Sequence, residues 1–456
     1  MESPAELKTT ASCHVVALPY PGRGHINPMM NLCRLMCSKK PDILITFVVT
    51  EEWYGFIGSD SKPANVRFGT IPNVIPSELV RANDFVGFLE AVHTKMEAPF
   101  EQFLDRLQLP VTAILTDTYM GWVVGVGNRR NIPVASLWTM SASVLSVFHH
   151  FDLLVKNQHF PADLSVRGDE IVDYIPGLSS TTLANLPTFF HGKGNQGLRR
   201  ALEPVSLLPK SQYLLFTSVN ELESRVIDVF KAEFDFPVYA IGPSIPFFIL
   251  EEDSPSSDYL QWLDSQPKAS VLYISLGSFL STSTEQTDEL VAGVRNSGVR
   301  YLWVSRGDTS WSKDGCGDKE LVIPWCDQLR VLCHSSVGGF WTHCGWNSTL
   351  EAVYAGVPML TFPIFWDQIP NSEQIVEDWQ IGWRVKRDTG SENLVSRQEI
   401  AEIIRKFMNL ENDEGKEMRR RARELGEACR GAVVKGGSSD VNLDSFIKDL
   451  SKDHAR

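Results

Sequence analysis

Runs of consecutive apolar residues, separated by helix-length amphipathic segments, recur along this chain and constrain its fold more than any other feature. In the first half they cover 14–18, 43–49, 111–115, 134–138 and 213–217. Strands that are apolar at nearly every position are typical of parallel sheets covered by helices on both faces. Because these runs alternate with helical patterns, we expect a doubly wound α/β sheet in this half.

A composition break divides the chain. Turn formers and acids gather between Gly242 and Ser257, and the alternation then restarts with apolar runs at 271–276 and 301–304. A chain of 456 residues also exceeds what one hydrophobic core usually serves. We therefore predict an α/β architecture of two Rossmann-like domains, divided as follows: a first domain over 1–240, a linker over 241–262, a second domain over 263–437 and a terminal helix over 438–456.

Ligands of open α/β sheets bind beyond the carboxyl ends of the strands. If the two sheets face each other across a cleft, one crevice is surrounded by the loops at His25, Asp117, Ser278 and His343. The sequence thus predicts a small-molecule site built by both domains.

Composition excludes several classes of function. The formal net charge of −13 opposes binding to nucleic acid or to anionic membranes. None of the eight cysteines forms a CxxC pair, which favours a reducing compartment. No apolar stretch approaches the roughly 20 residues of a membrane span, and the first residues lack the pattern of a secretory leader. We expect a cytoplasmic protein.

His25 and Asp117 are the candidate catalytic pair, because each follows a predicted strand of the same sheet. The loop before His25 is expected to lead into a helix capped by Asn27, with Pro28 at its first position. A hydroxyl nucleophile needs a base that works near neutral pH, and a carboxylate can hold an imidazole in the required tautomer. The alternatives are a loop histidine bonded to backbone and an aspartate that serves a turn or an N-cap.

A candidate phosphate site lies in the stretch 338–351, which predicts a strand, a glycine-bearing turn and a helix from about Asn347. The first N–H groups of such a helix lack internal partners and lie at the positive end of its dipole. Gly345 allows close backbone approach, and His343 and Ser348 can add donors. Ser348 and Glu351 also have capping-box spacing, which would explain both without a ligand. For Glu351, bonding to ribose hydroxyls is an equal alternative.

Further polar and aromatic residues flank this stretch. Trp325 could stack on a base, although a lone tryptophan is more often part of a core. Asp367 and Gln368 suit sugar hydroxyls, or alternatively begin a helix ahead of Pro370. The adjacent Cys–His pairs at 333–334 and 343–344 fit no usual zinc spacing, so no metal ligands are predicted. The Gly22–Asn27 segment lacks the third glycine of a dinucleotide fingerprint, which disfavours a nicotinamide site.

The segment from Trp325 to Gln368 resembles the donor-binding signature, the PSPG box, of plant UDP-dependent glycosyltransferases of small molecules. Similarity extends to the His25 loop, to Asp117 and to the stretch that ends at Thr139. The resemblance implies a GT-B fold, in which the first domain binds the acceptor and the second binds the UDP-sugar. It also implies that the C-terminal helix packs on the first domain.

The resemblance also implies roles for individual residues. It assigns the uracil to Trp325 and the backbone of Cys326, and the ribose to Gln328 and Glu351. The diphosphate would be held by Ser278, His343, Asn347 and Ser348, beside Gly345, and the sugar would be lined by Trp346, Asp367, Gln368 and Thr139. A final glutamine in the signature favours UDP-glucose. Asp327 stands where proline or alanine is commoner, which puts the loop before Gln328 in question.

The predicted reaction is a single displacement with inversion, in which His25, assisted by Asp117, removes the acceptor proton and UDP leaves toward the helix near Asn347. No metal and no permanently bound cofactor are expected, since UDP-glucose is a co-substrate. A nucleotide-sugar binding module without catalysis and an NAD-dependent oxidoreductase are the competing functions. The acceptor, a small lipophilic molecule, is not defined by the sequence, and a monomer is the default.

Overall fold

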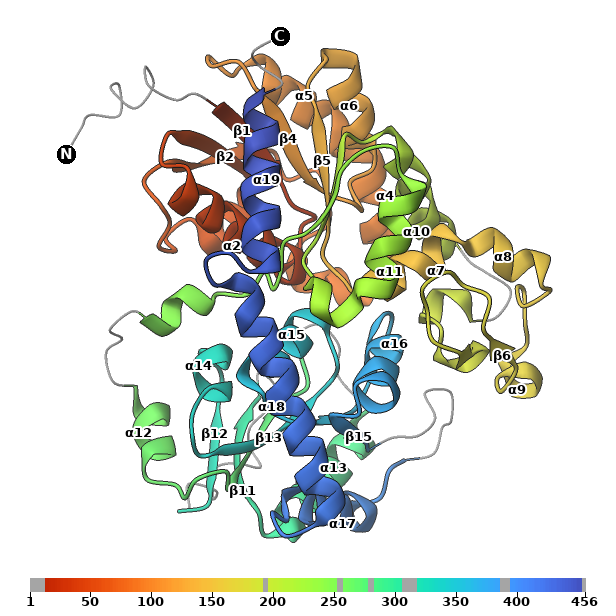
Figure 1. The fold of residues 1–456 in the computed structure, drawn as a ribbon, viewed down its shortest axis with the longest axis vertical. Coiled ribbons are helices and arrows are strands. Elements are labelled where there is room, and N and C mark those ends of the chain that lie inside the picture. The colour runs from red at the N-terminus through yellow and green to blue at the C-terminus, as the bar shows by residue number, and fades with distance from the viewer. Residues whose placement is uncertain are drawn as a thin grey trace. The chain divides into compact units, whose positions relative to one another are not determined.

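The computed structural model describes residues 13–191, 196–251, 257–277, 283–305, 318–385 and 394–452 (Figure 1). The chain forms two compact units. The first comprises Met1–Thr181, Phe189–Ile245 and Ala432–Arg456, and the second comprises Thr182–Thr188 and Pro246–Gly431. The division after Ile245 falls inside the stretch expected to be a linker. The chain re-enters the first unit at Ala432, within helix α18 (Asp413–Val433) and earlier than the expected residue 438.

The first unit is built on seven parallel strands in the order β3-β2-β1-β4-β5-β8-β9. The strands are β1 (Cys13–Leu18), β2 (Ile43–Thr50), β3 (Val66–Ile71), β4 (Ala113–Asp117), β5 (Val134–Trp138), β8 (Tyr213–Phe216) and β9 (Val238–Ala240). The order reverses between β1 and β4, where the chain first builds outward on one side and then on the other. This point is where open α/β sheets bind ligands.

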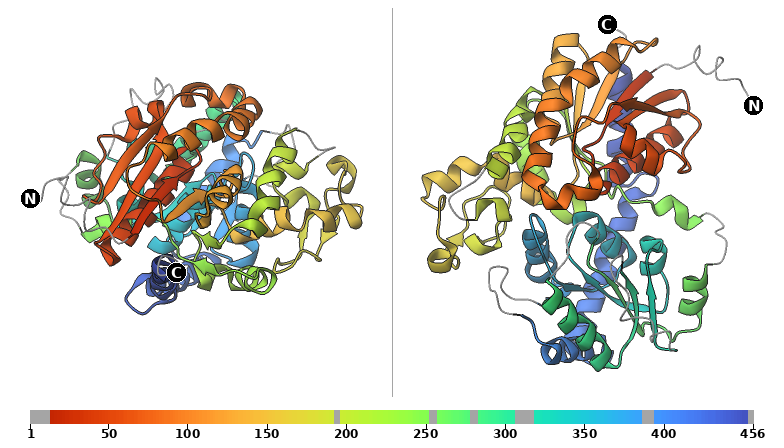
Figure 2. Two further views of the ribbon diagram at one scale, coloured as in Figure 1. Left: turned by 90° about the horizontal axis from the view of Figure 1, so that it is seen from above. Right: turned by 180° about the vertical axis from the view of Figure 1, so that it is seen from behind.

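Helices cover both faces of this sheet. α19 (Ser438–Lys452) lies over one face, and α5 (Glu97–Asp105) and α6 (Trp122–Arg130) lie over the other (Figures 1 and 2). The remaining helical segments are α2 (Arg23–Lys39), α3 (Glu51–Ile57), η1 (Glu78–Asn83), α4 (Phe85–Lys95), α7 (Ala142–His149), α8 (Phe151–Lys156), α9 (Leu164–Arg167), η3 (Thr188–Phe190), α10 (Gln196–Leu207), η4 (Leu208–Lys210) and α11 (Asn220–Glu233). A small two-stranded sheet joins β6 (Ile171–Val172) to β7 (Thr181–Thr182).

α19 belongs to the core of the first unit. Leu443, Phe446 and Leu450 are buried in one cluster with the apolar faces of α2 and β1. Polar contacts at the rim support the packing: Lys39 pairs with Asp440 at 2.5 Å, and the Tyr239 hydroxyl donates to Asp449 at 2.6 Å. The buried stripe of α19 therefore packs this C-terminal helix against the sheet that contains β1.

The second unit repeats the design with six parallel strands in the order β12-β11-β10-β13-β14-β15. The order reverses between β10 and β13. The strands are β10 (Val271–Ser275), β11 (Arg300–Val304), β12 (Glu320–Ile323), β13 (Val337–Thr342), β14 (Met359–Thr361) and β15 (Gly382–Arg384). The helical segments are η2 (Leu183–Asn185), η5 (Phe247–Glu251), α12 (Asp258–Asp264), α13 (Thr284–Ser297), α14 (Gln328–Leu332), α15 (Trp346–Ala355), α16 (Gln368–Glu373), η7 (Gln374–Asp378) and α17 (Arg397–Met408).

One predicted helix start is wrong. α2 begins at Arg23 with Gly22 as its N-cap, rather than at Pro28 with Asn27 as its N-cap. The backbone N–H groups of His25 and Ile26 both donate to the Gly22 carbonyl, at 3.0 and 2.9 Å, so the first turn closes earlier. Pro28 is the sixth residue of α2, so it lies inside the helix and supplies no N–H to the carbonyl four residues earlier. His25 therefore stands in the first turn of a helix and not in a loop.

Within the part of the chain that the structure describes, no helix is both long and apolar enough to cross a bilayer.

Candidate active site

His25 and Asp117 meet at the reversal point of the first sheet. His25 follows β1 and Asp117 ends β4, and these strands pair directly. Nδ1 of His25 lies 2.7 Å from Oδ2 of Asp117. The Asp117 side chain is 1% exposed and the His25 side chain 21% exposed, so the carboxylate is enclosed while the ring keeps access to solvent. The pair predicted from the sequence is thus brought together.

Three donors converge on the Asp117 carboxylate. Oδ1 accepts from the backbone N–H of Tyr119 at 2.9 Å. Oδ2 accepts from His25 and from the Thr139 hydroxyl, the latter at 3.2 Å. Because Nδ1 of His25 faces the carboxylate and a Thr139 hydroxyl whose own hydrogen goes to Asp117, Nδ1 carries the hydrogen, and Nε2 is the ring nitrogen that can accept a proton.

Thr139 belongs to this group in the first unit. Its hydroxyl oxygen lies 2.8 Å from Nδ1 of His25 as well as bonding to Asp117. The residue directly follows β5, the strand that pairs with β4. The sequence predicted a sugar contact for Thr139, which stays a prediction, but gave no sign of its bonds to His25 and Asp117.

Aromatic rings enclose the imidazole. The Tyr20 ring lies 4.8 Å from the His25 ring, and the Tyr119 ring lies 6.3 Å from it in an edge-on arrangement. The Tyr20 hydroxyl is buried and has no hydrogen-bond partner among the described residues. Burial raises the pKa of Tyr20 well above its usual range, so this phenol stays neutral. The apolar walls restrict the His25 ring to one orientation.

An ion pair that sequence reasoning missed supports the loop before His25. Nη1 of Arg81 donates to the Pro21 carbonyl at 3.0 Å and also pairs with Glu78 at 3.0 Å. Burial raises the pKa of Glu78 to about 7, with Arg81 opposing the shift. Both residues come from η1, a short segment without a recognisable motif, so nothing in the sequence distinguishes them.

Gln328 organises the candidate uridine site in the second unit. Its side-chain oxygen accepts from the Tyr273 hydroxyl at 3.0 Å, and its nitrogen donates to Ser348 at 3.0 Å and to Glu351 at 2.5 Å. Tyr273 comes from β10, Gln328 from α14 and the other two from α15. The predicted ribose ligands Gln328 and Glu351 are therefore in direct contact.

Trp325 and Cys326 precede this network. Trp325 is 63% exposed, so it is a surface platform and not a core residue. Cys326 is buried, with its sulfur 3.4 Å from the Tyr273 hydroxyl. Asp327 serves as the N-cap of α14, where its side chain accepts from the Arg330 backbone N–H at 3.3 Å. The departure at Asp327 thus fixes the start of α14 that Gln328 occupies.

The capping-box alternative for Ser348 and Glu351 is wrong. α15 begins at Trp346 and its N-cap is Gly345, without a side-chain cap bond. Ser348 therefore lies inside the first turn, where its hydroxyl accepts from Gln328. Burial raises the pKa of Glu351 to about 7, although the bond from Gln328 opposes the shift. A partly buried carboxyl held in this way needs an explanation other than helix capping.

His343 fills the space between two glycines at the reversal point of the second sheet. Gly277 adopts φ +88°, and a Cβ there would lie 2.9 Å from Cδ2 of His343. A Cβ on Gly345 would lie 2.5 Å from Nε2 of the same ring. Burial lowers the pKa of His343 to about 4, so the ring is neutral. Asn347 follows in the first turn of α15, while Ser278 lies outside the described residues.

The predicted sugar contacts are anchored around the start of α16. Oδ2 of Asp367 accepts from the Asn371 amide at 2.9 Å. The Gln368 oxygen accepts from the backbone N–H groups of Ile364 and Phe365, at 2.8 and 3.0 Å. The amide nitrogen of Gln368 is therefore the end that can donate to a ligand. Trp346 is buried, with 3% exposure for the whole residue, and it begins α15, whose first backbone N–H groups lack partners within the helix.

Comparison with known proteins decides the family. A sequence model described as UDP-glucoronosyl and UDP-glucosyl transferase matches residues 227–411. UDP-glycosyltransferase 87A2 of Arabidopsis thaliana is 55% identical over 442 residues, covering 96% of this chain and 97% of that one. The chain belongs to the UDP-glycosyltransferase family. A second Arabidopsis thaliana relative, UDP-glycosyltransferase 87A1, is also 55% identical and covers 95% of this chain and 100% of its own length.

A solved structure extends the likeness to three dimensions. Phytolacca americana UGT2, complexed with UDP-2fluoro-glucose and pterostilbene, aligns with a TM-score of 0.83 at 27% identity and covers 96% of this chain and 100% of that one. This chain therefore has the GT-B fold that the resemblance implied. Membership of a transferase family excludes the NAD-dependent oxidoreductase considered above.

Proposed function

We propose that this UDP-glycosyltransferase moves glucose from UDP-glucose to a hydroxyl of a small lipophilic acceptor, with inversion at the anomeric carbon. The observation that carries the proposal is the enclosed bond between Nδ1 of His25 and Asp117, which leaves Nε2 as the proton acceptor. A binding module without catalysis would not need such a pair.

The proposed step is one displacement. Nε2 of His25 takes the proton from the acceptor hydroxyl, whose oxygen forms a bond to the anomeric carbon of the donor. The bond between that carbon and the phosphate oxygen breaks, and UDP leaves with the electron pair. The imidazolium that forms is stabilised by the Asp117 carboxylate, which already receives three hydrogen bonds.

The second unit is proposed to hold the donor. Trp325 would stack on the uracil, with the backbone of Cys326 at its edge, and the Gln328–Glu351 pair would accept the ribose hydroxyls. The first N–H groups of α15, together with His343, Asn347, Ser348 and Ser278, would receive the leaving diphosphate. We propose that these donors make a metal ion unnecessary for the transfer.

Glucose is proposed because Gln368 offers an amide nitrogen beside the Asp367 carboxylate, a donor and an acceptor for adjacent sugar hydroxyls. Phytolacca americana UGT2 was crystallised with a fluorinated UDP-glucose and with pterostilbene, which supports both a glucosyl donor and a small aromatic acceptor. A monomeric, cytoplasmic enzyme without a permanently bound cofactor stays part of this proposal.

The test is a panel of UDP-sugars offered with a mixture of flavonoid, terpenoid and phenolic acceptors, with and without excess EDTA. Mass spectrometry should find hexosides formed fastest from UDP-glucose, and the proton coupling of the anomeric centre should show a β-glucoside made from the α-linked donor. Faster transfer from another UDP-sugar, an α-linked product, or activity that EDTA abolishes and Mn²⁺ restores would each contradict the corresponding part of the proposal.

A further inference from the structure

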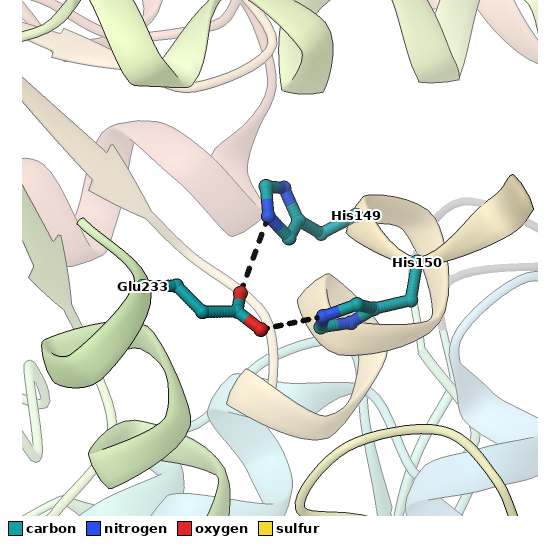
Figure 3. A group of neighbouring side chains, drawn as sticks. All are labelled: His149, His150 and Glu233. Carbon is teal, nitrogen blue, oxygen red and sulfur yellow. Dashed lines mark hydrogen bonds and ion pairs between the residues drawn. The ribbon is translucent and has the colours of Figure 1, made fainter. Parts of the chain in front are cut away.

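Two histidines and a glutamate lie next to one another in the first unit, outside the His25 group. His149 ends α7 and His150 follows it, while Glu233 is the last residue of α11 (Figure 3). Nε2 of His149 lies 3.4 Å from Oε2 of Glu233, and Nε2 of His150 lies 3.0 Å from Oε1. One ligand atom from each residue lies within 4.8 Å of the other two.

The hydrogen bonds of His150 fix its tautomer. Nδ1 lies 2.9 Å from the Ser146 carbonyl oxygen, which can only accept. It also lies 3.1 Å from the Ser146 hydroxyl, whose own hydrogen is donated to the Pro176 carbonyl at 2.7 Å. Nδ1 therefore carries a hydrogen. Nε2 then faces the Glu233 carboxylate, and this contact is favourable only when a proton or a metal cation lies between the two.

We propose that a divalent transition-metal ion of the zinc class binds to Nε2 of His149, Nε2 of His150 and the carboxylate of Glu233. Ligand atoms held at about 2.0–2.2 Å by one tetrahedral zinc ion lie roughly 3.3–3.6 Å apart. The two observed N–O separations, 3.4 Å to Oε2 and 3.0 Å to Oε1, involve different oxygens of Glu233. With one ligand atom from each residue the separations are within 4.8 Å, so binding of one ion would draw the ligand atoms together by up to about 1.5 Å. The bond from His150 to the Ser146 carbonyl is the outer-shell contact that orients a metal-bound imidazole.

The surroundings suit such an ion. The rings of Phe230 and Phe234 pack against His149 with centroids 5.5 and 5.3 Å away, which restricts its orientation. The Glu233 side chain is 35% exposed, so an ion and a water ligand can reach the site. Asp152, in the first turn of α8, adds a second negative charge that acts on His149.

A metal here would fasten α7 to α11 at one end. At the other end, the buried carboxylate of Glu223 in α11 already accepts from the N–H groups of Ala142 and Ser143, at 2.9 and 3.0 Å. α7 begins just after Thr139, so both fastenings act on a helix that leads away from the catalytic group. The metal is therefore structural. Neither histidine was predicted as a ligand, because Glu233 is distant in sequence and adjacent histidines match no ligand spacing.

Zinc binding is tested by titrating chelator-treated protein with Zn²⁺ in competition with a chromophoric chelator. The wild type should bind one ion per chain at micromolar or tighter affinity and should melt at a higher temperature with Zn²⁺. Glu233→Gln and His149→Ala should each weaken binding by more than the roughly 10–100-fold that loss of an outer-shell partner costs. His159→Ala is the matched control, since His159 pairs with Glu170 at 3.3 Å in the same unit but outside the three-residue group.

Far-UV circular dichroism of the zinc-free variants checks that they are folded. Zinc K-edge X-ray absorption of the loaded wild type provides a reading without any substitution, and it should show imidazole and oxygen ligands. Sulfur ligation, equal affinities in the wild type and Glu233→Gln, or no binding by the wild type would overturn the inference. Because binding is measured without turnover, its failure is distinct from failure of the proposed transfer, which should persist in EDTA well below the melting temperature.

Discussion

The imidazole of His25 and the carboxylate of Asp117 lie 2.7 Å apart although 92 residues separate them in the chain. Their strands, β1 and β4, are neighbours at the only place where the order of the described strands in this sheet reverses. Each residue emerges at the carboxyl end of its strand, so the topology itself brings a base and its orienting group together. The remaining question is what each contributes to turnover.

Removal of the imidazole should abolish most of the proposed base catalysis. We expect His25→Ala to lower kcat by about 10²–10⁴-fold, the usual contribution of a positioned base. UDP affinity should not change, since the predicted donor residues other than Thr139 belong to the second unit. Steady-state kinetics and UDP-induced thermal shifts separate the two effects. Wild-type turnover in His25→Ala would remove the residue from this role.

Asp117→Asn should test the charge of the Asp117 side chain separately from its shape. Asparagine keeps the shape and the acceptor for the Tyr119 N–H, but it offers no charge to an imidazolium at His25. We expect a fall in kcat with little change in UDP affinity. A kcat equal to that of the wild type would mean that Asp117 only builds the turn after β4.

Thr139 offers a matched pair of variants. Its hydroxyl contacts His25 and Asp117 at once, so Thr139→Val should disturb the pair while preserving volume. Thr139→Ser retains the hydroxyl and should behave like the wild type. We expect the valine variant to lower kcat and alter the pH dependence of kcat/KM, with the KM for UDP-glucose unchanged. A rise confined to that KM would instead support the sugar contact predicted from the sequence.

The sequence predicted the sheets and the His25–Asp117 pair well, because both depend on patterns that survive without coordinates. Apolar runs indicate buried parallel strands, and polar residues after such strands gather at one edge. The start of α2 was predicted wrongly, because Asn27-Pro28 is a stronger local N-cap signal than Gly22. The backbone bonds from His25 and Ile26 to the Gly22 carbonyl have no counterpart in the sequence pattern. Arg81 was not predicted because η1 carries no recognisable motif, and the His149–Glu233 group was not predicted because Glu233 is distant in sequence from the two histidines.

Glu351 should make the stability of the enzyme depend on pH. Burial raises its pKa from 4.5 to about 7, so between these values the folded chain holds a proton that the unfolded chain has lost. The free energy of unfolding should therefore fall as pH rises through this window, by at most about 3 kcal/mol before solvent screening, and this contribution should be constant above it. Glu351→Gln should remove this slope.

The measurement is the melting temperature of wild type and Glu351→Gln across this window. Glu78, whose pKa is also about 7, contributes a similar slope, so Glu78→Gln is the matched comparison and the difference between curves isolates each carboxyl. Parallel curves for the wild type and Glu351→Gln would show that Glu351 titrates normally. Uridine binding should also weaken below about pH 7 in the wild type and in Glu78→Gln but not in Glu351→Gln, because protonation of Glu351 removes an acceptor for the ribose.

Gln368 has two functions that two substitutions can separate. Its oxygen accepts from the backbone N–H groups of Ile364 and Phe365, which shapes the segment ahead of Asp367. Gln368→Glu keeps this acceptor but removes the amide donor proposed for the sugar, whereas Gln368→Ala removes both. We expect the glutamate variant to retain the wild-type melting temperature and UDP affinity but to lose kcat/KM for UDP-glucose. The alanine variant should lose stability as well, since two partly buried N–H groups lose their partner. If the glutamate variant turned over UDP-glucose as the wild type does, the amide would contribute only to the backbone segment, and the choice of sugar would have to come from other residues.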